Sequence, residues 1–236
     1  MSAEAVLMSG SDPAPIELAW FTPAPPVVKP ERILRIHGYP DLARVRPAIT
    51  AAAAVAAERA QHLCDSRVAF RRVAIEAHDG ALLQLHGGIS LHCAAFAQTL
   101  EGCDEAVAFV LTLGPRLDAK VIEMTDQGDL LDALLLETAG WLAIEDATRQ
   151  FRTMLRDGAA TNGRRITSRM GPGYSYRIDG QDHAWALDEQ RRLFELFGGA
   201  ALPVTLMESC AMLPKMSRSG LIGVGPSENT AGRSTQ

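Results

Sequence analysis

The sequence lacks the short motifs that mark several large classes of enzyme. It contains no Walker phosphate-binding motif, no GxSxG nucleophile motif and no GxGxxG dinucleotide fingerprint. Gly87 and Gly88 follow a possible strand but leave such a fingerprint incomplete. A conventional methyltransferase built on a Rossmann domain is therefore disfavoured, because that fold uses a glycine-rich loop to approach its ligand.

Cysteines and long apolar runs are scarce as well. The cysteines form no CxxC pair and have no histidine at a zinc-type spacing, so we expect reduced core thiols and no metal site. There is no apolar run of about 18 residues, and the N-terminus has no basic segment followed by a sustained apolar one. These absences predict no membrane helix, no signal peptide and a cytoplasmic location. The cysteines are Cys64, Cys93, Cys103 and Cys210.

The composition is typical of a globular protein. Hydrophobic residues make up 47% of the chain and charged residues 22%, which is enough to bury a core without a disulfide or a metal. The formal net charge of −5 disfavours a nucleic-acid partner, which would require a basic face. We expect a Pro-rich extended arm over residues 1–30, one domain over 31–225 and a flexible polar tail over 226–236. Within the arm, Trp20 and Phe21 are candidates for docking on the body.

The middle of the chain mixes helices and strands irregularly. The run 106–112 predicts a strand buried on both faces, and 130–155, apolar nearly all round in its first half, predicts a long central helix. Further helices are expected over 41–63, with an Asp41 cap and Pro47 in the first turn or at a kink, and over 91–100, 117–124 and 187–197. Further strands are expected over 67–77, 82–85, 204–207 and 221–224. Because no βαβ repeat is visible, the sequence predicts an α+β fold.

The densest chemical signal is the segment Arg169-Met170-Gly171-Pro172-Gly173-Tyr174. Its glycines and proline fix a tight backbone path that a ligand can approach closely. An arginine in front of such a turn can pair bidentately with a carboxylate, and a tyrosine behind it offers a ring face and a hydroxyl. An ordinary turn carrying a surface arginine is the alternative interpretation.

Two further signals involve single carboxylates. The stretch from Leu206 to Gly220 is apolar, is punctuated by small residues and carries Glu208, for which a buried, hydrogen-bonded place in a core strand is the simplest interpretation. Glu145 lies on the long apolar helix, where a buried carboxylate requires a partner. That partner is either Arg149, four residues on, or the cationic group of a ligand.

Together these segments carry a resemblance to a known family. RMGPGY resembles the Arg-x-x-x-Gly-Tyr signature of the activation domain of vitamin B12-dependent methionine synthase, and LMESCAMLPKMSRSG is similar to that domain's second conserved block. The spacing between the two blocks also fits. AVAFVLTLGPRLD and ILRIHGYPDL resemble segments of stand-alone relatives, so that the resemblance covers about residues 31–225.

The resemblance implies a single helmet-shaped α+β domain with a small, mainly antiparallel sheet that binds S-adenosylmethionine in a shallow groove. In that family the ligand donates a methyl group when cob(II)alamin is reduced, which restores methylcobalamin. Carried over by position, Arg169 would hold the methionine carboxylate and Glu145 would face the amino group. Gly173 and Tyr174 would shape the groove beside the adenosyl group.

Met170 and Gly171 would line the turn through backbone atoms. The resemblance also implies cobalamin on a partner, either a corrinoid-binding protein or the methionine synthase core, and an external electron donor such as a flavodoxin. The chain would be an accessory part of a cobalamin-dependent methyltransferase. It would work by positioning rather than by acid–base catalysis, since the cofactor carries the hard step.

Two other functions stay open. The chain ends soon after the second block, which favours a non-catalytic ligand-binding or interaction subunit of a corrinoid methyltransferase complex. A conventional methyltransferase acting on a small molecule is the third hypothesis. It is weakened by the missing glycine-rich loop and by the lack of an obvious general base near RMGPGY.

Overall fold

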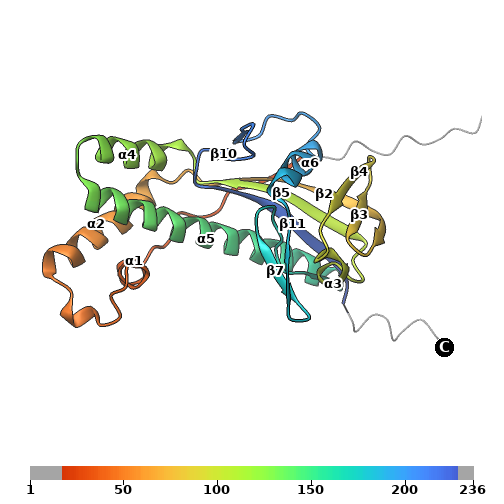
Figure 1. Cartoon of the computed structure of the whole chain (residues 1–236), viewed down its shortest axis with the longest axis horizontal. Coiled ribbons are helices and arrows are strands. Elements are labelled where there is room, and N and C mark those ends of the chain that lie inside the picture. The colour runs from red at the N-terminus through yellow and green to blue at the C-terminus, as the bar shows by residue number, and fades with distance from the viewer. Residues whose placement is uncertain (1–17, 228–236) are drawn as a thin grey trace, which may run out of the picture.

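Two elements in the middle of the chain organise the fold. Strand β5 (Glu105–Thr112) is an apolar run that is buried on both faces, as its sequence predicts. Helix α5 (Leu130–Thr161) is the longest element and runs along one face of the sheet (Figure 1). Phe151 of α5 packs on Phe109 of β5, with the two ring centroids 5.3 Å apart. The computed structural model describes residues 18–227 of the chain.

Strand β5 lies in a curled antiparallel sheet of seven strands. The order is β4-β3-β2-β5-β11-β6, and β1 pairs with β2 outside this path. The other strands of the sheet are β1 (Ala19–Phe21), β2 (Arg67–Asp79), β3 (Leu82–Leu85), β4 (Ile89–His92), β6 (Arg164–Ile166) and β11 (Ser217–Pro226). Two short hairpins stand apart from it, β7 (Ser175–Ile178) with β8 (Gln181–Ala184) and β9 (Thr205–Leu206) with β10 (Met212–Leu213).

A separate core covers each face of the sheet, because successive side chains of a strand point to opposite faces. Val107 and Phe109 belong to the core under α1 (Pro30–Ile36), α2 (Pro47–Leu63), α4 (Pro115–Asp126) and α5. Ala108 and Val110 belong to the other core, under α3 (Phe96–Thr99), α6 (Gln190–Glu195) and the buried Trp185. The predicted α+β fold with a mainly antiparallel sheet is therefore confirmed.

Two of the predicted helices begin later than their sequences suggest. Asp41 caps a short 3-10 helix, η1 (Leu42–Arg44), by accepting a hydrogen bond from the backbone N–H of Ala43. Helix α2 then begins at Pro47, where a missing N–H costs nothing. The helix predicted over 91–100 is wrong in its first part, because Ile89–His92 pairs with β3 as strand β4 and only Phe96–Thr99 is helical.

The C-terminal third differs most from the sequence prediction. Strands β6, β7 and β8 are present in the structure but were not predicted from the sequence. The helix predicted over 187–197 divides into η2 (Leu187–Glu189) and α6. The strand predicted over 221–224 is ten residues long, and the one predicted over 204–207 has two residues. These segments are short or glycine-rich, and their conformation depends on their partners.

The Pro-rich segment docks on the body within its described part. Strand β1 pairs with β2, and the Phe21 ring lies 6.0 Å from the Phe151 ring, while Trp20 is 50% exposed. Residues 1–17 and 228–236, which contain most of the predicted arm and tail, lie outside the described residues.

The cysteines behave as structural thiols. All four are free, Cys93 and Cys210 are buried, and burial raises the pKa of Cys64 to about 12. None of the helices within residues 18–227 is both long and apolar enough to cross a membrane.

Candidate functional site

The segment that follows β6 is fixed to the sheet at Met170. Its N–H donates to the carbonyl of Leu221 and its carbonyl accepts from the N–H of Leu221, both at 2.8 Å. Met170 is fully buried. A side chain at Gly220 of β11 would lie 2.0 Å from the carbonyl oxygen of Met170, so the glycine is what allows this close approach.

The turn after Met170 is held from two sides. The hydroxyl of Tyr176 accepts from the N–H of Gly171 at 2.6 Å and donates to its carbonyl at 3.0 Å. Gly173 has a φ of +83° and donates to the carbonyl of Trp185 at 2.7 Å. The backbone N–H of Trp185 in turn donates to the carbonyl of Tyr174 at 2.9 Å. The path predicted for the two glycines is thus rigid, which fixes the residues at either end of the turn.

Arg169 and Tyr174 meet across this turn. The guanidinium carbon of Arg169 lies 4.8 Å from the centroid of the Tyr174 ring. Burial lowers the pKa of Arg169, and the nearby charge of Arg218 lowers it further. The Nη1 atom of Arg169 is buried and has no hydrogen-bond partner among residues 18–227. Because a buried unpaired donor is costly, this atom is suited to an anionic ligand group.

Glu145 of α5 lines the same groove as Arg169. Its Oε1 accepts a hydrogen bond from Arg218 of β11, whose side chain is 6% exposed and also donates to Thr148 at 3.1 Å. The hydrogen bond from Arg218 lowers the pKa of Glu145, and burial opposes it. The prediction that Arg149 is the partner of Glu145 is wrong, because Arg149 pairs with Asp146, the residue after Glu145. The Glu145 side chain is 54% exposed, which leaves its charge accessible to a ligand.

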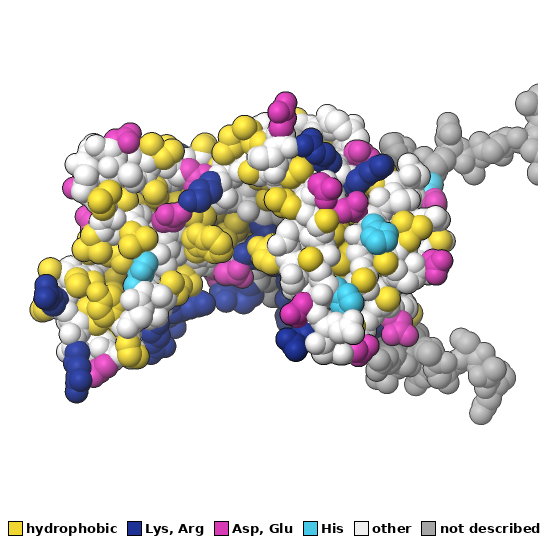
Figure 2. Space-filling model, viewed as in Figure 1, with side chains coloured by type: hydrophobic (Ala, Val, Ile, Leu, Met, Phe, Trp, Pro, Cys, Tyr) yellow, Lys and Arg dark blue, Asp and Glu magenta, His cyan; other side chains and the backbone are white. Residues whose placement is uncertain are grey.

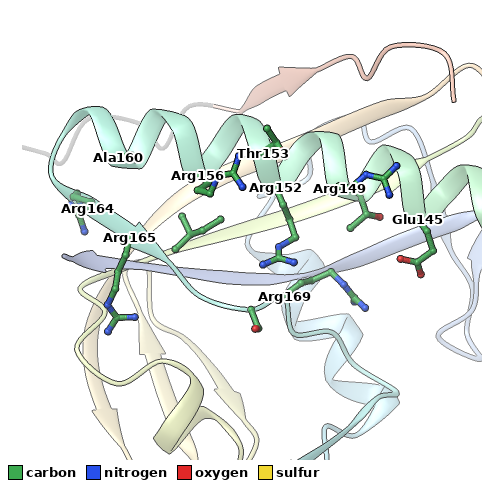
Figure 3. Close-up of a pocket in the computed structure, with 12 residues that line it drawn as sticks. Glu145, Arg149, Arg152, Thr153, Arg156, Ala160, Arg164, Arg165 and Arg169 are labelled. Carbon is green, nitrogen blue, oxygen red and sulfur yellow. The ribbon is translucent and has the colours of Figure 1, made fainter. Parts of the chain in front are cut away.

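A groove of about 720 Å³ separates the second half of α5 from the segment 164–169 (Figure 3). Glu145 and Arg169 lie at one end of it, and Arg164 and Arg165 lie at the other. Basic side chains also gather in the hollow between the helical end of the molecule and the β7–β8 hairpin on the face in Figure 2. The groove is lined by Glu145, Thr148, Arg149, Arg152, Thr153, Arg156, Ala160, Arg164, Arg165, Ile166, Ser168 and Arg169.

The sequence and the fold of the whole chain were compared with those of known proteins. Neither a protein-family model nor a curated protein matches the sequence. Among solved structures, the crystal structure of the MetH reactivation domain bound to AdoHcy matches with a TM-score of 0.62 and 17% identity, over 88% of this chain and 78% of that chain. The chain has the fold of the MetH reactivation domain. The resemblance found in RMGPGY and the second block is thereby confirmed at the level of the fold.

Within the MetH reactivation-domain fold, the residues predicted for the site come together. Glu145 and Arg169 both line the groove, and Tyr174 stacks beside Arg169. Met170, Gly171 and Gly173 contribute the rigid backbone on which Arg169 and Tyr174 stand. Their roles toward a ligand remain a prediction.

Three features of the site differ from the sequence prediction or were missed by it. Glu208 is exposed, in the turn between β9 and β10, so the buried position in a core strand is wrong. Arg218 was missed, although its place inside an otherwise small and apolar strand signals a buried charge that needs a partner. Trp141, which lines a small neighbouring pocket with Tyr174 and Arg218, was missed because an exposed aromatic on an apolar helix has no sequence signature.

The same region offers no obvious metal site. Within residues 18–227, His, Cys, Asp and Glu side chains do not gather in groups of three that could hold a metal ion.

Proposed function

We propose that this chain binds S-adenosylmethionine where Glu145, Arg169 and Tyr174 meet, and thereby supports reductive methylation of a protein-bound corrinoid. The observation that carries the proposal is the buried Nη1 of Arg169, which has no hydrogen-bond partner among the described residues and lies beside an accessible carboxylate and a ring face. S-adenosylmethionine presents a carboxylate, an ammonium and a sulfonium, which are the complements of these three groups. The solved neighbour of the same fold is bound to AdoHcy, the demethylated form of this ligand.

Each residue has a separate task in this proposal. The guanidinium of Arg169 donates to the ligand carboxylate, and a charge-assisted pair of this kind is stronger than a neutral hydrogen bond. Glu145, held in its charged form by Arg218, accepts from the ligand ammonium. Tyr174 offers its ring to the cationic and adenosyl side of the ligand. Gly171 and Gly173 keep Arg169 and Tyr174 in place.

The methyl transfer itself would be supplied by the ligand and a corrinoid rather than by side chains of this chain. The bound ligand provides an activated methyl group on its sulfonium, and the residues described here bind and orient it. The corrinoid would be carried by a partner, a corrinoid-binding protein or a methionine synthase core, in the cytoplasm. The electron would come from an external donor such as a flavodoxin.

A second function, ligand binding without methyl transfer, would use the same residues. Glu145, Arg169 and Tyr174 are placed to bind a ligand, whereas methyl transfer would depend on a corrinoid partner rather than on these side chains. Such a chain would act as a binding subunit of a corrinoid methyltransferase complex. Binding of S-adenosylmethionine without methylation, when a corrinoid protein and a reductant are supplied, would separate this function from the first.

The test is calorimetric titration of S-adenosylmethionine into the wild-type chain and into Arg169→Ala. Loss of a charge-assisted contact costs on the order of 1.5–3 kcal/mol, so Kd should rise about tenfold or more. Arg192→Ala is the matched control, because Arg192 lies on α6, is 58% exposed and pairs with Glu195 outside the groove. Absence of wild-type binding at millimolar ligand, or an equal loss in both variants, would overturn the proposal.

A further inference from the structure

The groove continues well beyond the proposed S-adenosylmethionine site, and its far part is basic. Arg149, Arg152 and Arg156 project from one side of α5, and Arg164 and Arg165 approach from β6 (Figure 3). Within residues 18–227, Glu145 at the opposite end is the one acid that lines the groove. The chain as a whole has a net charge of −5, so this concentration of positive charge is local.

Two of these arginines are not neutralised by a carboxylate of the described residues. Arg149, Arg156 and Arg164 pair with Asp146, Asp157 and Asp104, respectively. Among the described residues, neither Arg152 nor Arg165 has a carboxylate partner; Arg165 donates to the backbone carbonyl of Glu101 at 2.9 Å. Guanidinium groups gathered without counter-charges repel one another, and a bound anion relieves that repulsion.

S-adenosylmethionine does not account for this charge. It carries one carboxylate against an ammonium and a sulfonium, which leaves it with a net positive charge. Its carboxylate is already assigned to Arg169, at the same end of the groove as Glu145. The far part of the groove would repel this ligand, so a ligand bound there would have to be a different molecule.

The lining of this far part indicates the class of occupant. Arginine presents a planar fork of donors that matches phosphate oxygens, and the hydroxyls of Thr153 and Ser168 add further donors. Among the described residues, the apolar ones there are Ala160 and Ile166, and none of them offers an aromatic ring on which a base could stack. The whole groove, including the end at Glu145 and Arg169, has a volume of about 720 Å³, which is within the range of small-ligand sites.

We propose that the half of the groove formed by Arg152, Arg156, Arg164 and Arg165 binds a small ligand with two or more linked phosphate groups. The phosphate chain, rather than a base or sugar, supplies the recognition. This site is separate from the proposed function, because it uses arginines other than Arg169.

The experiment titrates inorganic tripolyphosphate into the wild-type chain and into the double variant Arg152→Gln/Arg165→Gln by calorimetry at low ionic strength. We expect Kd for tripolyphosphate to rise roughly tenfold or more in the double variant, since two charge-assisted contacts are lost. The control is Arg67→Gln/Arg192→Gln, which removes the same charge from exposed arginines outside the groove. Its Kd should stay within about twofold of the wild type, because exposed charges at a distance are largely screened.

The remaining measurements identify the source and separate the two proposals. ATP is titrated in parallel: an affinity equal to that of tripolyphosphate assigns recognition to the phosphates alone, and a tighter one adds a nucleoside contact. No binding of either compound at millimolar concentration, or an equal loss in the control variant, would overturn the site. S-adenosylmethionine should bind the groove double variant as it binds the wild type. Failure of that ligand alone, with tripolyphosphate still bound, would overturn the proposed function and leave the phosphate site standing.

Discussion

Glu145 is kept ionised by its neighbours. The hydrogen bond from Arg218 lowers its pKa below the ordinary value of 4.5, and the charges of Arg218, Arg169 and Arg32 add to this against the opposing effect of burial. Because the pKa in the folded state is lowered, the contribution of Glu145 to stability is complete above the ordinary pKa. It is lost as the pH falls through the lowered value.

A pH dependence of ligand binding follows at this scale. If Glu145 accepts the ligand ammonium, Kd for S-adenosylmethionine should be constant from about pH 7 to about pH 5 and should rise only below the ordinary carboxylate pKa. Glu145→Gln should weaken binding at neutral pH and abolish the rise in acid, as measured by calorimetry across the pH series. Glu105→Gln is the control, since Glu105 pairs with Arg72 away from the groove. A rise in Kd centred above about pH 5 would contradict the assignment.

Single residues also mark the limit of the sequence interpretation. Arg169 was recognised because a turn with two glycines follows it directly in the chain. Arg218 was not, because its partners Glu145 and Thr148 lie on α5, 73 and 70 residues earlier. A charge that is explained only by a distant partner cannot be interpreted from its local sequence.

Strand β11 is the element on which the site depends. It pairs with β5 along one side and with β6 on the other, and it carries Arg218 and Gly220. Its glycines at 220, 223 and 225 each lie so close to neighbouring atoms that an added side-chain carbon would have to displace them. The strand is therefore a close-packed support for the turn that bears Arg169 and Tyr174.

Gly220→Ala tests this element. The added carbon would lie 2.0 Å from the carbonyl oxygen of Met170, so the paired backbones must separate. We expect a loss of about 1–3 kcal/mol or more in the free energy of unfolding, measured by urea denaturation, together with weaker S-adenosylmethionine binding. Gly158→Ala on the exposed side of α5 is the matched control, because nothing lies within 4 Å of its added carbon. It should stabilise by roughly 0.5–1 kcal/mol, and equal effects in the two variants would contradict the role of β11.

The elements that were mispredicted share a physical cause. Strands β6 to β8 have three or four residues each, too few for a period of two to emerge from the sequence. The last two residues of strand β4 were assigned to a helix because they are compatible with either period, and pairing with β3 makes them a strand. Strand β5 was predicted correctly because eight largely apolar residues without a helical period suit a strand buried on both faces.

At the scale of the whole molecule, the N-terminal segment connects the sheet to the helical layer. Strand β1 extends the sheet beside β2, and the chain then crosses to α5. There the N–H of Ala24 donates to Gln150 at 2.8 Å and the N–H of Val27 donates to Asp146 at 3.3 Å. The segment therefore contributes to stability without contacting the proposed ligand residues.

Two neighbouring residues of β1 allow this to be measured. Phe21 packs on Phe151, whereas Trp20 is 50% exposed, so the two rings differ in burial on the same strand. Phe21→Ala should lower the free energy of unfolding by about 1.5–3 kcal/mol, and Trp20→Ala by clearly less. Affinity for S-adenosylmethionine should be unchanged in both variants. A larger loss for Trp20→Ala in urea denaturation would show that the segment is not anchored through Phe21.

The sequence by itself determined the fold class, the buried strand β5, the long helix α5 and the turn that carries Arg169 and Tyr174. Each of these is encoded by a continuous local pattern of apolar residues or glycines. Such a pattern can be recognised without knowing which distant residues it contacts in the fold. Tertiary structure alone decided that Arg218, rather than Arg149, holds Glu145, and that arginines of α5 and β6 line one groove. Those features join residues distant in the chain, so they exist only after the sheet and helices have packed together.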